Sequence, residues 1–161
     1  MNRIGCQLFY SFDPASLSTH NPAWNTRFDR LTVLTVLANL MAMGYSFSPD
    51  GAFIVSGSYD ETVKVWRVES GECVTTFNGH LSWVTSVSCS PDGASIVSGS
   101  RHGTVKVWRV ESGECVTTLE GHSDWVTSVS CSPDGASIVS GSLDKTVKVW
   151  SVESGECVTT F

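Results

Sequence analysis

GHSDWVTSVSCSPDGASIVSGSLDKTVKVWSVESGECVTTF, residues 121–161, decides the fold because nearly the same stretch also occupies residues 79–119. The earlier copy reads GHLSWVTSVSCSPDGASIVSGSRHGTVKVWRVESGECVTTL, and 34 of the 41 aligned positions are identical. A third, more diverged copy precedes them, and its proline and tryptophan recur at the same interval of 42 residues: Pro49, Pro91 and Pro133; Trp66, Trp108 and Trp150. A fixed period of this length indicates a repeat architecture, in which each unit is one supersecondary structure.

Each unit predicts four short β-strands joined by tight turns. Val84–Cys89 is rich in Val, Thr and Ser and ends at the turn 90–93, where proline sets the first dihedral and glycine accepts a positive φ. Three further strands follow at Ala94–Ser98, Thr104–Val110 and Glu114–Leu119. Strands connected in this way form an antiparallel meander.

Both faces of the predicted sheet carry large apolar side chains. Alternation along the third strand places Val105 and Val107 on one face and Trp108 and Val110 on the other. A sheet of this kind must be covered on both sides. Stacking like units face to face would provide that cover.

Several spaced motifs resemble those of the WD-repeat family of β-propellers. They are Gly79-His80 and Gly121-His122, an aspartate in the second hairpin (Asp60, Asp144), and the repeated tryptophan (Trp66, Trp108, Trp150). The resemblance covers roughly residues 38–161, although the tryptophan is followed by Arg67, Arg109 and Ser151 and not by aspartate. It implies an all-β fold in which each unit is one propeller blade around a central channel. We expect three four-stranded blades, at 45–78, 79–120 and 121–161, forming an incomplete ring.

The resemblance also implies a structural role for the His, Ser, Asp and Trp of each unit, which would form a hydrogen-bonded tetrad. The third unit has all four members: His122, Ser140, Asp144 and Trp150. The second has His80, Ser98 and Trp108, with His102 in place of the aspartate; the first has Ser56, Asp60 and Trp66, with Ala38 in place of the histidine. A catalytic Ser-His-Asp triad would need its serine at an exposed sharp turn beside oxyanion donors. Because these serines lie within predicted strands, we expect no enzyme activity.

The differences between the two near-identical copies suggest a binding face. Five of the seven fall before the first strand or in the turn between the second and third, which share one end of a meander. Tryptophans stand beside these positions, and aromatic residues are enriched at protein interfaces. Drift in tolerant turns explains the pattern equally well. The candidate partner-binding residues are Leu81, Ser82, Trp83, Arg101, His102, Ser123, Asp124, Trp125, Leu143 and Lys145.

The composition indicates which class of partner and which cellular compartment to expect. The net charge of −6 and the pI of about 5.0 argue against a nucleic-acid partner. Five of the six cysteines lie in predicted strands, without a C-x-x-C pair, so we expect buried, reduced thiols, no metal or cofactor, and an intracellular protein. The expected function is a scaffold that binds protein or peptide partners. The alternatives are a regulatory or sensor module of a larger protein and, with least support, a propeller enzyme.

Residues 1–44 lack the repeat, and we expect an irregular segment there. Met1–Asn25 shows no period and no signal-peptide pattern. Leu31–Met43 is apolar but too short to span a membrane, so no membrane partner is expected. Its Leu, Ala and Met content favours a helix over 34–43, whereas LTVLT at 31–35 also matches a decayed fourth strand.

Closure of the ring is the remaining question, because propellers have four to eight blades. Three blades would leave an apolar face bare at each end, which soluble monomers rarely tolerate. Two arrangements would cover these faces: a longer repeat array, of which this chain is a fragment, or a homo-oligomer in which two copies join head to tail. The sequence favours the fragment, since a head-to-tail pair closes only if the rotation per blade suits six blades.

Overall fold

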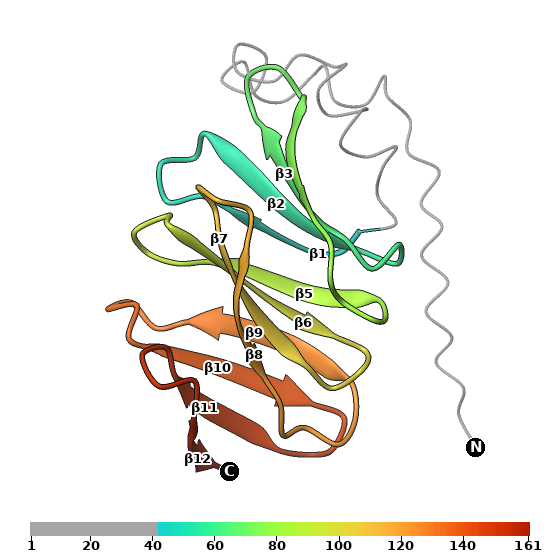
Figure 1. Ribbon diagram of the computed structural model, residues 1–161, viewed down its shortest axis with the longest axis vertical. Coiled ribbons are helices and arrows are strands. Elements are labelled where there is room, and N and C mark those ends of the chain that lie inside the picture. Colours follow the sequence, from blue (N-terminus) through green and yellow to red (C-terminus); the bar gives the residue numbers. More distant parts are fainter. Residues whose placement is uncertain (1–41) are drawn as a thin grey trace, which may run out of the picture.

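The computed structural model describes residues 42–161, and within this range every regular element is a β-strand (Figure 1). No helix that could cross a membrane occurs in this part of the chain. The strands are β1 (Ala42–Phe47), β2 (Phe53–Ser58), β3 (Val63–Arg67), β4 (Cys73–Phe77), β5 (Val84–Cys89), β6 (Ser95–Ser100), β7 (Val105–Arg109), β8 (Cys115–Leu119), β9 (Val126–Cys131), β10 (Ser137–Ser142), β11 (Val147–Ser151) and β12 (Cys157–Thr160).

The twelve strands form three separate four-stranded sheets, which we call blades 1, 2 and 3. Their strand orders are β1-β2-β3-β4, β5-β6-β7-β8 and β9-β10-β11-β12, all antiparallel. Figure 1 shows the sheets stacked in chain order. The predicted all-β fold of three meander blades is confirmed.

The proline-containing turn fixes the first hairpin of each blade. In blade 2 the Ser90 hydroxyl donates to the Asp92 carboxylate at 2.5 Å, and that carboxylate accepts the backbone N–H of Ala94 at 2.9 Å. Gly93 closes the turn with φ +72°, a conformation that glycine adopts without steric cost, and its N–H donates to the carbonyl of Ser90. The same bonds recur 42 residues earlier and later.

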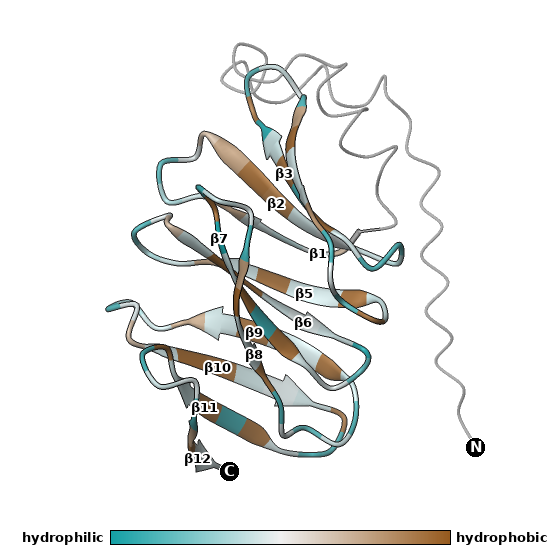
Figure 2. Cartoon of the chain, in the orientation of Figure 1, coloured by the Kyte–Doolittle hydropathy of each residue, from teal (hydrophilic) through white to brown (hydrophobic). Residues whose placement is uncertain are grey.

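Two hydrophobic clusters lie between neighbouring blades. Blade 2 contributes Val84, Ile96 and Trp108 to the cluster shared with blade 1. Val97 and Val105 point the other way, into the cluster shared with blade 3. Figure 2 shows hydrophobic positions alternating with polar ones along the strands of all three sheets. Burial on both faces, as the alternation in the third strand predicts, makes each blade dependent on its neighbours.

The outer face of blade 3 is exposed, and the ring is not closed. Val139 and Val147 are 38% and 41% exposed, whereas their counterparts in blade 2, Val97 and Val105, are 1% and 0% exposed. The difference arises because blade 3 covers the blade 2 residues, while no described blade covers those of blade 3.

The first strand begins earlier than the expected boundary at residue 44. Ala42 and Met43 belong to β1, so the expected helix over 34–43 is wrong at its C-terminal end. Ala42 pairs with Ser58 across the first hairpin, so the end of the stretch is held in the sheet. Pairing within the sheet overrides the helix preference of Ala and Met. The rest of that apolar stretch, including Ala38, lies outside the described residues.

The cysteine expectation is partly wrong. The five described cysteines are free, but Cys73, Cys115 and Cys157 are exposed, and Cys89 and Cys131 are half-buried. The exposed three begin β4, β8 and β12, the edge strands of the sheets. An edge strand has a neighbour on one side only. Burial raises the pKa of the Cys89 and Cys131 thiols.

Candidate functional site

In blade 3, four side chains from separate elements form one continuous hydrogen-bonded chain. The indole N–H of Trp150 on β11 donates to the Ser140 hydroxyl on β10 at 2.8 Å. That oxygen lies 2.7 Å from Nε2 of His122, and Nδ1 of His122 lies 2.7 Å from the carboxylate of Asp144. The chain ties the segment before β9 to the second and third strands of the same blade.

Asp144, at one end of this hydrogen-bonded series, accepts bonds from several donors besides His122. Its carboxylate also accepts the hydroxyl of Thr146 at 2.6 Å and the backbone N–H groups of Thr146 and Ser123 at 2.9 and 3.1 Å. Burial by itself would raise the pKa of Asp144, but the bonds from Thr146 and His122 outweigh it and hold the pKa well below its ordinary value. The carboxylate is therefore ionised at neutral pH and charge-assists the bond to His122.

The corresponding chain in blade 2 lacks its last member. Trp108 and His80 both reach the Ser98 hydroxyl, at 2.8 and 2.6 Å. His102, which stands where blade 3 has Asp144, is exposed, and Nδ1 of His80 is buried without a hydrogen-bond partner. Burial, assisted by the charge of Lys106, lowers the pKa of His80 to about 4, so this imidazole is neutral at pH 7.

Blade 1 has the tryptophan, the serine and the aspartate of the tetrad but not the histidine. Trp66 donates to the Ser56 hydroxyl at 2.9 Å. Asp60 accepts the hydroxyl of Thr62 at 2.6 Å and pairs with Lys64 at 3.0 Å on the surface. Burial would raise the pKa of Asp60, but the bonds from Thr62 and Lys64 lower it to about 2.

The burial of these groups decides what they can do chemically. Ser98 and Ser140 have no exposed surface, and each hydroxyl is held between an indole N–H and an imidazole. A substrate carbonyl could not approach either oxygen without unfolding the blade. The arrangement suits holding strands together and does not present a nucleophile.

The variable positions gather at one end of the blades, which we call the blade-top face. It consists of residues 81–83 and 123–125 before β5 and β9, and of the turns 101–103 and 143–145. Backbone hydrogen bonds join these segments directly, from the Arg101 N–H to the Trp83 carbonyl and from the Leu143 N–H to the Trp125 carbonyl, both 2.9 Å. The invariant turns at 90–93 and 111–113 lie at the opposite end.

Side chains on the blade-top face differ in exposure. Leu81 is 76% and Leu143 53% exposed, which is unusual for leucine in a folded domain. Half-buried are Ser82, Trp83, Arg101 and Trp125; exposed are His102, Ser123, Asp124 and Lys145. The two tryptophans are thus neither free anchors nor core residues.

An aromatic row crosses this face from blade to blade. The rings of Tyr59 and Trp83 meet edge to face with centroids 4.5 Å apart, and the centroids of Trp83 and Trp125 are 6.3 Å apart. The guanidinium of Arg101 contacts both indoles, and its central carbon lies 4.5 Å from the Trp83 ring centroid and 4.0 Å from that of Trp125. Sequence reasoning missed Tyr59, although it occupies the register position of Arg101 and Leu143 in the repeat.

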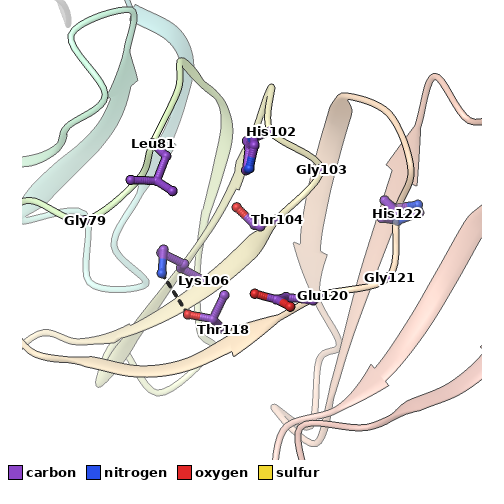
Figure 3. Close-up of a pocket in the computed structure, with 10 residues that line it drawn as sticks. All are labelled: Gly79, Leu81, His102, Gly103, Thr104, Lys106, Thr118, Glu120, Gly121 and His122. Carbon is purple, nitrogen blue, oxygen red and sulfur yellow. Dashed lines mark hydrogen bonds between the residues drawn. The ribbon is translucent and has the colours of Figure 1, made fainter.

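A hollow of about 390 Å³ is lined mainly by residues of blade 2 (Figure 3). Leu81 and His102 of the blade-top face line it, together with Lys106 and Glu120. The ammonium of Lys106 donates to the Thr118 hydroxyl at 2.7 Å. Variable and invariant residues therefore line this depression together, and its lining is of mixed polarity.

Comparison with known proteins places this architecture in a family. The model of the family described as "WD domain, G-beta repeat" matches residues 38–67, 71–109 and 113–151. The chain belongs to the WD-repeat family. Together with the three four-stranded sheets, the match confirms the resemblance found in the sequence.

Relatives of this WD-repeat chain are matched over short stretches. It is 42% identical over 46 residues to a lissencephaly-1 homolog of Heterostelium pallidum, covering 29% of this chain and 11% of that protein. It is 46% identical over 37 residues to a lissencephaly-1 homolog of Branchiostoma floridae, covering 23% of this chain and 9% of that protein. The chain thus spans about a tenth of the length of these curated relatives.

Solved structures are similar over most of the three blades. The structure of U3-55K superposes with a TM-score of 0.71 and 29% identity, and the RRP9 WD40 repeats with 0.71 and 30% identity. Each match covers 74% of this chain and 38% of the other. The likeness supports a propeller-type stacking of the blades.

Proposed function

We propose that this WD-repeat chain is a non-enzymatic scaffold whose blade-top face binds a protein or peptide partner. The observation that carries the proposal is the position of the differences between the two near-identical repeats, five of seven of which lie on this face. The buried hydrogen-bonded chains hold the blades beneath it rigid. Variable loops on a rigid support are where proteins most often carry binding function.

The chemistry of the face favours a protein partner. It combines exposed leucines with half-buried tryptophans and an arginine, residue types that anchor protein interfaces. A net charge of −6 disfavours attraction to nucleic-acid phosphates. The five cysteines of residues 42–161 are free thiols, three of them exposed, which suits a reducing intracellular compartment.

Site-specific photo-crosslinking tests the proposal. A photoreactive amino acid replaces Leu81 on the blade-top face in one protein, and Ser112, exposed in the invariant turn at the opposite end, in its matched control. Crosslinked partners identified by mass spectrometry should appear with the probe at 81 and be absent with the probe at 112. Equal capture from both positions, or capture from 112 alone, would place the binding face elsewhere.

A further inference from the structure

Arg101 contacts two tryptophans from neighbouring blades, whose rings are inclined to one another by 71°. Its guanidinium carbon lies 4.5 Å from the ring centroid of Trp83, in its own blade, and 4.0 Å from that of Trp125, in blade 3. The repeat places Tyr59 and Leu143 at the same register position, so the clamped cation is unique to blade 2 among the three blades. Contact with two aromatic rings restricts the rotamers of the arginine and removes part of its guanidinium surface from water.

The hydrogen-bonding edge of this guanidinium is unused within the described structure. Both ion pairs of residues 42–161 lie elsewhere, between Lys64 and Asp60 and between His122 and Asp144. The nearby Asp124 carboxylate instead accepts the backbone N–H of Trp125 at 2.7 Å. Five N–H donors in a fixed planar fork are therefore presented at the surface with their orientation already set.

A planar acceptor with two oxygens matches such a fork. We propose that Arg101 binds a carboxylate of the partner, so that the blade-top face selects an acidic peptide segment with an Asp or Glu side chain paired to the guanidinium edge. The bond is bidentate and charge-assisted. Because the two indoles already restrict the arginine side chain, little further conformational entropy is lost when the carboxylate binds. This inference rests on the proposed function and names the chemistry of its partner.

The other charged side chains near Arg101 favour the binding of a short acidic motif over that of a long acidic tract. Lys145, His102 and Asp124 are exposed on the same face, and Glu120 is exposed near it. The negative groups would repel a run of carboxylates but leave room for one seated on Arg101. An isolated arginine on a chain of net charge −6 gives little attraction to a phosphate backbone.

The test uses the whole chain and two matched fluorescent heptapeptides. One alternates glycine with glutamate and aspartate, and the other has glutamine and asparagine at the same places. Fluorescence anisotropy should show the acidic peptide binding about tenfold or more tightly than the amide peptide, as expected for a charge-assisted pair. In nuclear magnetic resonance spectra, the side-chain Nε–Hε signal of Arg101 should shift as the acidic peptide is added.

The repeat itself supplies matched variants. Arg101→Leu and Arg109→Ser each replace an arginine by the residue that blade 3 carries at that position, and each removes one positive charge. Arg109 is exposed at the opposite end of the blade. Arg101→Leu should abolish the preference for the acidic peptide, Arg109→Ser should keep it, and Arg101→Lys, which keeps the charge without the fork, should retain part of it.

Three results would overturn the inference. They are equal affinity for the two peptides, equal losses in Arg101→Leu and Arg109→Ser, and Arg101-dependent binding of single-stranded oligouridylate that is tighter than that of the acidic peptide. If a partner still crosslinks from position 81 in the Arg101→Leu chain with undiminished yield, the scaffold function stands and the carboxylate assignment falls.

Discussion

His80 and His122 occupy the same place in successive blades, yet only His122 has a partner at each ring nitrogen. The difference comes from one substitution, since blade 2 carries His102 where blade 3 carries Asp144. A buried donor or acceptor without a partner loses its hydrogen bond to water and gains nothing in return. In blade 2, one substitution therefore leaves a buried ring nitrogen without a partner.

Replacing His102 with Asp should stabilise the protein. The new carboxylate would accept from Nδ1 of His80, as Asp144 does from His122, and a bond to a charged group contributes about 1.5–3 kcal/mol. Chemical denaturation should show the free energy of unfolding rising by that order, while Asp144→His should lower it. His102→Asn, a neutral acceptor, is the control and should give a smaller gain. Unchanged stability in all three variants would contradict the assigned tetrad.

The lowered pKa of His80 makes stability depend on pH. The unfolded chain binds a proton on this side chain near pH 6.5, but the folded chain does so only near pH 4. Protonation of His80 therefore does not affect stability above about pH 6.5, and the free energy of unfolding falls as the pH drops from 6.5 towards 4. Denaturation between pH 5 and 7.5 should show a shallower fall in His102→Asp than in His102→Asn, because the carboxylate raises the pKa of His80. Identical slopes would contradict this origin.

At the scale of the strand, close approach between blades depends on a glycine in the second strand. A methyl group built on Gly99 of β6 would lie 2.5 Å from Cγ1 of Val126 and 2.9 Å from Cγ1 of Val129, both on β9. The equivalent Gly141 of β10 faces the uncovered side of blade 3, where the nearest atom, Oγ1 of Thr127, is 3.9 Å away. The same Val-Ser-Gly sequence is thus constrained by the neighbouring blade in one place and unconstrained in the other.

This contrast gives a prediction with an internal control. Gly99→Ala should destabilise the protein by about 1–3 kcal/mol, because the added methyl group forces blades 2 and 3 apart. Gly141→Ala should be nearly neutral, since its methyl group meets open space. Thermal and chemical unfolding of the two variants compares them directly. A Gly141→Ala loss as large as that of Gly99→Ala would show that the outer face of blade 3 is covered in solution.

At the scale of the whole molecule, the three blades form an arc with an uncovered apolar face. Val139 and Val147 mark this face on blade 3, and Tyr45, at the register position of the buried Val87, is 71% exposed on blade 1. The blade 2 residues at corresponding positions are covered because a neighbouring blade is present. The two exposed faces could meet one another in a second copy, or each could meet a further repeat.

Val147→Asp should reduce self-association. A charge on the uncovered face of blade 3 would oppose stacking with another copy, whereas Val105→Asp, at the same register position but fully buried, should prevent folding. Light scattering over a range of concentrations measures the mass of the wild type and of the Val147→Asp variant. A wild-type protein that stays monomeric at every concentration would argue against association through this face.

By itself, the sequence determined the features that repeat. The 42-residue period, the Ser-Pro-Asp-Gly turn and the Trp–Ser spacing act within one blade, so local chemistry suffices to predict four strands and their two apolar faces. The tertiary structure decided what depends on the neighbouring blade. Arg101 meets Trp125 only because two blades stack, and Val97 is buried where Val139 is not. Val97 and Val139 lie in identical strand sequences but differ in burial, because the burial of a side chain depends on the neighbouring blade across from it. Only the packed structure shows whether that blade is present.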